Sequence, residues 1–333
     1  MSDPPADDSR RLAGESTGDR ARADGAPAND GARDTDAADG PRAFGHPRAA
    51  VATDLAAVVA VAVVLLAVHV LLPESVRDQL AFYHAAFAPE RLLGSAEFAG
   101  LGSRGSQVGN LLTAAYVHAD RTHLFGNLGG YLSLSLVTYL VCLHADRRRW
   151  FHRTVPAFLL ALPVAVNLTS YVVLEVRFPG SAPVSRGFSG VVAGFGGFLL
   201  VAVAIHLRRR YSPETAFFVG QFAILLLFAE LLWIYAGTVT IVEGTAIVGG
   251  LGVSVAGIVL RAGRTGPSPE HLRRVGFDLL YVSLVLALLV WLVYGLFPPD
   301  PVARGAFTNV FAHGAGFVEG GLLAALTLVG VRR

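Results

Sequence analysis

The 333-residue sequence contains no lysine, a single cysteine and few charged side chains. Because Cys142 stands alone, an internal disulfide and a multi-cysteine metal site are both excluded. Charged residues make up 16% of the chain and hydrophobic residues 53%, whereas soluble domains carry roughly 25% charged residues. This composition excludes an ordinary soluble domain and indicates an integral membrane protein. The formal net charge is only +2, and we expect no nucleic-acid partner.

Large apolar side chains are also nearly absent from residues 1–48, where ten acidic residues and seven arginines are interspersed with Ala, Gly, Ser and Pro. Such a segment buries too little apolar surface to offset the entropy lost on ordering. We therefore expect a disordered tail, followed by one membrane domain over 49–333. The tail does not resemble a signal peptide, because no apolar run occurs in its first 45 residues.

Apolar runs of roughly 20 residues, the length needed to cross a bilayer core of about 30 Å, recur along the rest of the chain. They predict an all-α polytopic membrane protein with about eight spanning helices. The expected spans are 50–72, 121–143, 154–176, 188–207, 214–236, 239–260, 276–297 and 307–330.

Arginine placement predicts the orientation of these helices. The arginine clusters follow the second, fourth and sixth spans, and the chain ends in Arg332 and Arg333. With eight spans, all of these positions fall on one side, which the positive-inside rule makes cytoplasmic. We therefore expect a multi-pass protein of the cell membrane with both termini in the cytoplasm.

The 73–120 connection is long and lies on the expected outer side. Its stretch Val76–Leu93 mixes apolar and charged residues. Two interpretations stay open, a segment lying in the plane of the membrane interface and a loosely folded outer loop.

Ser189 is the first candidate for chemistry, because it stands at the outer start of the fourth span. A helix N-terminus offers unpaired N–H groups that can stabilise a developing oxyanion. The alternative is structural, since serine is a common N-cap and the neighbouring glycines suit close helix packing.

His313 is the second candidate, about two turns into the last span. An ionisable side chain at that depth marks a functional site by default. Gly316 and Gly320 follow on the same face and leave room for a neighbouring helix, for which the segment carrying Gly190 and Gly194 is the expected partner. The alternative is a histidine satisfied by a backbone carbonyl or a water.

His118, His123 and Asn127 form the third set. His123 and Asn127 are four residues apart, so on a helix they share one face and can donate hydrogen bonds to the same point. Three histidines, counting His313, could also bind a metal ion. We expect no metal, because no zinc-enzyme spacing such as H-E-x-x-H is present.

Taken together, the motifs resemble those of the rhomboid family of intramembrane serine proteases. The sequence has H-x-x-x-x-H-x-x-x-N at His118–Asn127, G-x-S-G at Gly187–Gly190 and A-H-x-x-G-x-x-x-G at Ala312–Gly320. The resemblance covers about 50–210 and 307–330. It implies a rhomboid-like bundle of six helices, here with two extra helices within about 239–297, between the serine and histidine helices.

The resemblance implies a role for each matching residue. Ser189 would be the nucleophile and His313 the general base and then acid, with no cofactor. His123, Asn127 and the Ser189 N–H would bind the oxyanion. The supporting positions would be His118, Gly187, Gly190 and Gly316.

Two positions depart from the family pattern. The family often has a Trp-Arg pair where this chain has Gly109-Asn110, and a tyrosine that stacks on the catalytic histidine where this chain has Ala193. A smaller residue at Ala193 leaves the imidazole less supported.

The expected activity is cleavage of transmembrane protein substrates, within the lipid bilayer and near its outer face. Two other functions stay open. A rhomboid-like pseudoprotease would bind membrane clients without cutting them. A transporter would use the acidic residues Glu230, Glu243 and Glu319 in the expected spans, although the halves show no matching repeat.

Overall fold

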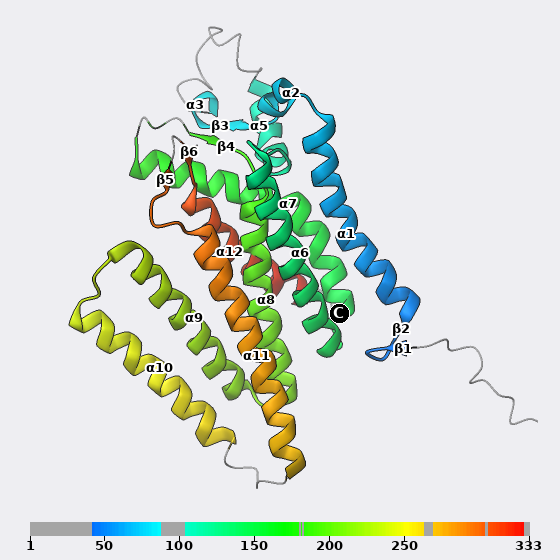
Figure 1. The fold of residues 1–333 in the computed structure, drawn as a ribbon, viewed down its shortest axis with the longest axis vertical. Coiled ribbons are helices and arrows are strands. Elements are labelled where there is room, and N and C mark those ends of the chain that lie inside the picture. Colours follow the sequence, from blue (N-terminus) through cyan, green and yellow to red (C-terminus); the bar gives the residue numbers. More distant parts are fainter. Residues whose placement is uncertain are drawn as a thin grey trace, which may run out of the picture. The chain divides into compact units, whose positions relative to one another are not determined.

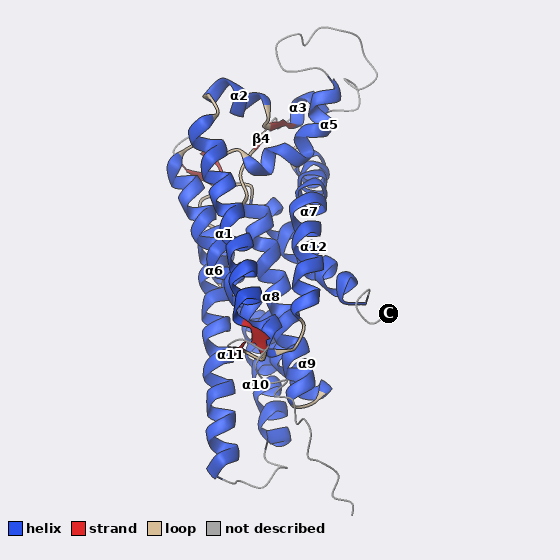
Figure 2. Cartoon of the chain, turned by 90° about the vertical axis from the view of Figure 1, so that its right-hand side faces the viewer, coloured by secondary structure: helices blue, strands red, loops and turns tan. Residues whose placement is uncertain are grey.

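The computed structural model describes residues 42–87, 104–179, 181, 183–262, 269–303 and 306–329. These residues are mostly helical (Figure 2). Strands occur in them only as two-residue pairs, all antiparallel: β1 (Arg42–Ala43) with β2 (His46–Pro47), β3 (Phe82–Tyr83) with β4 (Val184–Ser185), and β5 (Val302–Ala303) with β6 (Ala306–Phe307).

Eight helices in the described part of the chain are long and apolar enough to cross a membrane (Figure 1). They are α1 (Arg48–Leu71), α6 (Arg121–His144), α7 (Arg148–Arg177), α8 (Ser189–Arg210), α9 (Pro213–Ala236), α10 (Ile241–Ala262), α11 (Pro269–Leu296) and α12 (Val310–Val329). The prediction of an all-α polytopic membrane protein with eight apolar spans is therefore confirmed.

After α11, which begins at Pro269 and not near 276, the largest difference in boundaries is at α7, which begins at Arg148 and not near 154. Its additional first turns carry Trp150 and Phe151, both buried in the core. Packing against the other helices thus extends α7 over a segment in which arginines lower the hydropathy below that of a spanning helix.

The predicted disordered tail lies mostly outside the described residues, which begin at Arg42. Within its last residues, 42–47 form the β1–β2 hairpin, and α1 begins at Arg48.

The described residues of the long connection after α1 form the short helices α2 (Glu74–Gln79), α3 (His84–Phe87) and α5 (Arg104–Thr113), and the 3₁₀ turn η2 (Ala114–Tyr116). Phe82 is fully buried in a small apolar cluster with Leu111, Ala114 and Tyr171. In its described residues, therefore, the connection is packed against α7 and is not loosely folded. Its position in a membrane interface stays a prediction, and residues 88–93 of the predicted stretch lie outside the described residues.

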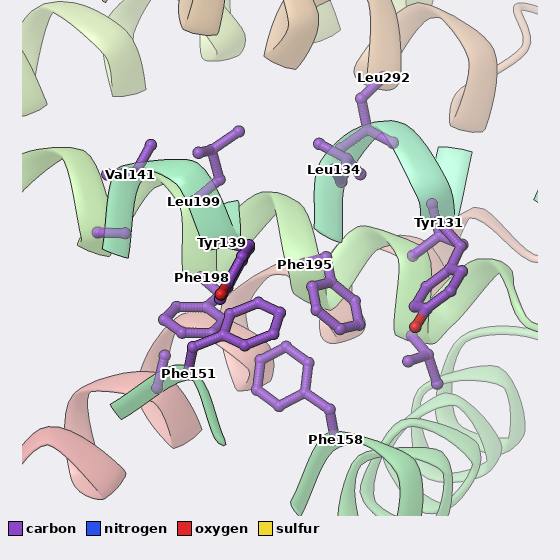
Figure 3. Packing of buried hydrophobic residues seen from close by; sticks show 14 of the residues in the cluster. Tyr131, Leu134, Tyr139, Val141, Phe151, Phe158, Phe195, Phe198, Leu199 and Leu292 are labelled. Atoms are coloured by element: carbon purple, nitrogen blue, oxygen red, sulfur yellow. The ribbon is translucent and has the colours of Figure 1, made fainter. Parts of the chain in front are cut away.

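Helix α8 lies at the centre of the core and is the most buried of the eight. Phe195 and Phe198 project from it into an aromatic cluster with Tyr131, Phe151 and Phe158 from α6 and α7 (Figure 3). Aromatic pairs in these stacked, tilted and edge-on arrangements contribute beyond their buried area. This packing fixes the helix that begins with Ser189.

Helix α12 packs directly on α8 through glycines. A Cβ on Gly320 would lie 2.4 Å from Gly194 Cα, so the two backbones are in contact. Small residues permit this approach, and the predicted pairing of Gly190 and Gly194 with α12 is confirmed.

The three helices between α8 and α12 differ in their surroundings. Helix α10 packs against α9 and is hardly buried, whereas α11 packs against α6, α8 and α9. The assignment of two extra helices to 239–297 stays a prediction, and α11 from that range reaches the site described next.

Candidate active site

Ser189 is the first residue of α8, after Phe188 at the N-cap. Its Oγ lies 2.8 Å from His313 Nε2 and makes no capping bond. The Ser189 side chain is therefore not the cap of its own helix, whereas the close helix packing expected at the neighbouring glycines is present. Residues 124 apart in the sequence are joined by one hydrogen bond.

The His313 ring makes two hydrogen bonds, which together define its tautomer. Its Nδ1 lies 2.5 Å from the carbonyl oxygen of Leu296, and a carbonyl oxygen can only accept. Nδ1 therefore carries the proton, and Nε2 accepts from the Ser189 hydroxyl. The ring is buried, with 5% exposure. This is the arrangement that a general base needs before it takes a proton from serine.

The depth expected for His313 needs correction. Helix α12 begins at Val310, so His313 lies in its first turn and not two turns in. Asn309 sets this start because its Oδ1 accepts a hydrogen bond of 3.1 Å from the Ala312 N–H. Phe307, expected to begin the last span, lies in β6 (Ala306–Phe307).

His123 and Asn127 lie together beside Gly187, as their spacing predicts. A Cβ on Gly187 would lie 2.7 Å from His123 Nε2 and 3.3 Å from Asn127 Nδ2. Gly187 has φ of +114°, which disfavours other residues there as well. Asp120 orients the start of α6, because its Oδ1 accepts a 2.8 Å bond from the His123 N–H.

The Asn127 amide is buried, and its Nδ2 has no hydrogen-bond partner among the described residues. Asn127 also lines the cavity that contains Ser189. A buried donor without an acceptor is costly, so it marks a place where an acceptor is expected to bind.

His118 links the loop before α6 to the loop before Ser189. Its Nε2 accepts a 3.3 Å hydrogen bond from the Phe188 N–H, and its carbonyl accepts one from Arg77. Burial, together with the nearby His123, lowers the pKa of His118 to about 3. The ring is therefore neutral at physiological pH and acts as an acceptor, which agrees with the supporting role expected for it.

The site opens into a cavity of about 1250 Å³. The cavity lies between the spanning helices, and residues from five of them line it: His123 and Asn127 of α6, Pro163, Val166 and Asn167 of α7, Ser189 and Gly190 of α8, Trp291, Leu292 and Leu296 of α11, and His313 of α12. Its volume exceeds the range of roughly 300–1,000 Å³ common for small-ligand pockets and suits a segment of polypeptide.

No group of three or more His, Cys, Asp or Glu side chains in the described residues is arranged to hold a metal ion. The three histidines are engaged differently. His118 accepts a backbone N–H and His313 binds Ser189, while His123 packs against Gly187.

The acidic residues of the transporter alternative do not share one environment. Glu243 forms a capping box with Thr240 at the exposed start of α10, through a side-chain bond to the Thr240 N–H of 2.9 Å. Glu319 accepts a 2.6 Å bond from Thr169 between α12 and α7. These contacts do not connect the two carboxylates into a path for ions.

Of the residues that depart from the family pattern, Asn110 and Ala193 are buried and Gly109 is exposed. The Asn110 amide donates to the carbonyls of Gln79 and Ala81 at 2.8 Å each and holds α5 against the loop after α2. Ala193 is buried in α8. Beside His313, the aromatic ring is Phe297, with centroids 5.9 Å apart at 82°.

Leu296 and Phe297 are the site residues that the sequence did not reveal. The only signal was the pair Pro298-Pro299, which ends a helix and leaves its last carbonyls unpaired. The two prolines indicate a carbonyl without a backbone donor, but they do not indicate which group donates a hydrogen bond to it.

In comparisons with known proteins, no family model, no curated protein and no solved structure matches the chain.

Proposed function

We propose that the protein is a serine endopeptidase of the membrane that cleaves transmembrane protein substrates, with Ser189 as nucleophile and His313 as base. The observation that carries the proposal is the 2.8 Å hydrogen bond between Ser189 Oγ and His313 Nε2, at a cavity between spanning helices. The resemblance of the three motifs to the rhomboid family supports the same conclusion.

In the proposed reaction, Ser189 Oγ attacks the scissile carbonyl while its proton passes to His313 Nε2. The tetrahedral oxyanion lies near the start of α8, where the Ser189 N–H has no partner within the helix. The side chains of His123 and Asn127 are the other donors. His313 then protonates the leaving amine. In the second step a water molecule attacks the acyl-enzyme and gives a proton to His313, and His313 returns a proton to Ser189 Oγ.

The substrate class follows from the position of the site. A spanning helix hides its peptide bonds in its own hydrogen bonds, so a substrate must unwind before its carbonyl reaches Ser189. We expect cleavage near helix-breaking or small residues, at the end of the bundle opposite the arginine-rich loops. By the arginine placement, that end is the outer face of the cell membrane, and both termini are cytoplasmic.

The test is labelling of the purified protein in detergent by a fluorophosphonate, with the modified peptide identified by mass spectrometry. We expect label on Ser189 in the wild type and none in Ser189→Ala or His313→Ala. Ser185→Ala is the matched control, because Ser185 Oγ also lies 2.8 Å from a histidine, Nε2 of His84. It should label like the wild type.

A folded wild type that takes no label would overturn the proposal. It would favour the alternative of a pseudoprotease that binds membrane clients without cutting them. Label on Ser185 in place of Ser189 would also reject the assignment of the nucleophile.

A further inference from the structure

The carboxyl end of α11 has a free carbonyl beside the active site. Helix α11 ends at Leu296, and Pro298 and Pro299 follow. Proline has no N–H and disfavours helical geometry in the residue before it. Phe297 still donates a 2.9 Å bond to the Val293 carbonyl, but the helix does not continue to supply a donor for Leu296.

The Leu296 carbonyl instead accepts from His313 Nδ1 at 2.5 Å. The next residue adds a second contact, because the edge-on ring of Phe297 lies 5.9 Å from the imidazole centroid. Two consecutive residues therefore fix both the tautomer and the plane of the His313 ring. The position where the family often has a stacking tyrosine is Ala193, which has no ring to offer.

The end of a helix also has an electrostatic effect on this ring. Unpaired carbonyls give the carboxyl end of a helix a partial negative charge, which favours a cation in contact with it. His313 becomes a cation when it takes the Ser189 proton. The Leu296 carbonyl is therefore placed to hold the imidazole before the reaction and to stabilise the imidazolium during it.

Helix α11 is held in place along its length. Near its beginning, Asp278 pairs with Arg210 at 3.2 Å. Near its end, Leu292 packs so closely on α8 that a Cβ on Gly196 would lie 2.5 Å from Leu292 Cδ2. The position of Leu296 at His313 is thus set by the packing of a whole helix.

We propose that Leu296 and Phe297 are the positioning residues of the catalytic base, so that His313 is competent only while the end of α11 is seated on it. The carbonyl of Leu296 then has the orienting role that a third side chain has in a triad. This inference rests on the proposed function, since it assigns a role in the same reaction.

The test compares fluorophosphonate labelling kinetics of two variants with matched controls. In Pro298→Ala/Pro299→Ala, α11 is free to extend and the Asp300 N–H competes for the Leu296 carbonyl. Pro213→Ala is its control, since Pro213 lies in the first turn of α9. Phe297→Ala removes the ring contact, and Phe217→Ala is its control because Phe217 is exposed.

We expect the maximal rate of inactivation to fall roughly ten- to hundredfold in the double proline variant, the usual effect of losing a hydrogen bond to a charged group. The fall in Phe297→Ala should be smaller. The concentration for half-maximal rate, the labelled fraction at the plateau and the melting temperature should stay near wild type. Both controls should match the wild type.

Wild-type rates in both test variants would overturn the inference. So would a lower plateau with an unchanged rate constant, because that pattern reports unfolded protein. A readout independent of labelling is the ¹⁵N spectrum of the histidine side chains, with His313 assigned by its loss in His313→Gln. We expect a protonated Nδ1 in the wild type and a mixture of tautomers in the double proline variant.

The two proposals fail in different ways. If the wild type takes no label but the His313 tautomer still changes in the double proline variant, the proposed peptidase activity is rejected and the contact between Leu296 and His313 is retained. Normal labelling in every variant, with an unchanged tautomer, rejects the positioning role and leaves the peptidase intact.

Discussion

Gly316 of α12 lies against Gly190 of α8, so closely that a Cβ on Gly316 would be 2.1 Å from the Gly190 carbonyl oxygen. Gly190 follows Ser189 directly, and Gly316 lies three residues after His313. The close packing of the two backbones therefore sets the distance between the Ser189 hydroxyl and the imidazole.

The first prediction is that Gly316→Ala reduces labelling of Ser189 on the order of a hundredfold. The added methyl group forces α12 away from α8, and a displacement of about 1 Å can lower a rate by that factor. Gly314→Ala is the control on the same helix, because a Cβ there meets nothing within 4 Å. Labelling kinetics of both variants check this. Equal rates for the two would contradict the idea that glycine packing aligns the dyad.

A second prediction concerns the free amide of Asn127. If Asn127 donates only to the oxyanion, Asn127→Ala lowers the labelling rate about 10²- to 10³-fold. The same change should leave the melting temperature unchanged or higher, because it removes a buried donor with no partner in the described residues.

Asn110→Ala should show the opposite pattern. The Asn110 amide is fully engaged with two backbone carbonyls, so its loss lowers the melting temperature and leaves the labelling rate of the folded protein unchanged. A stability loss in Asn127→Ala with no change in rate would show that Asn127 is structural.

The spanning helices were predictable because a bilayer demands length and apolarity, and both can be counted in a single segment. The pairing of Ser189 with His313 was predictable for another reason, since the expected topology puts both residues at the same outer depth and three motifs, in order, resemble those of one family. Gly316 is an example of a residue whose neighbour could be named in advance.

What the sequence did not predict depends on contacts between distant segments. The start of α12 is set by the Asn309 side chain, and the first turns of α7 by the burial of Trp150. The partner of His313 Nδ1 is a backbone carbonyl, which every residue carries and no residue type marks. In the sequence, nothing distinguishes Leu296 from the other apolar residues of a spanning helix.

The third prediction concerns a buried carboxylate that joins α1 to α6 and α7. Asp54 accepts from Arg148 at 2.6 and 2.9 Å and from the Tyr139 hydroxyl at 2.5 Å, and its side chain is 6% exposed. Asp54→Asn leaves Arg148 without its counter-ion. We expect a loss of about 2–3 kcal/mol in the free energy of unfolding.

Asp78→Asn is the matched control for that change. Its pair with Arg186 has a similar distance, 2.8 Å, and the two arginines are almost equally exposed, at 27% and 28%, but the Asp78 side chain is 42% exposed where that of Asp54 is 6% exposed. Exposed pairs contribute less than about 1 kcal/mol. Unfolding in mixed detergent micelles measures both variants, and similar losses for the two would contradict a special role for Asp54.

The last prediction is a loss of stability in acid that depends on His118. The folded-state pKa of His118 is about 3, below the ordinary value of 6.5, because the ring is buried. Between these values the unfolded chain binds a proton that the folded chain does not. This contribution to stability is therefore full above pH 6.5 and declines as the pH falls toward 3.

His118→Gln removes this titration, and the Gln side-chain oxygen can still accept the Phe188 N–H. We expect the melting temperature of the wild type to fall more steeply between pH 7 and pH 4.5 than that of the variant. Differential scanning fluorimetry in detergent measures both slopes. Parallel slopes would mean that His118 does not need to be neutral in the folded protein. The link between the η2 turn and the start of α8 would then depend on other contacts, such as the 2.9 Å hydrogen bond from the Gly187 N–H to the Ala114 carbonyl.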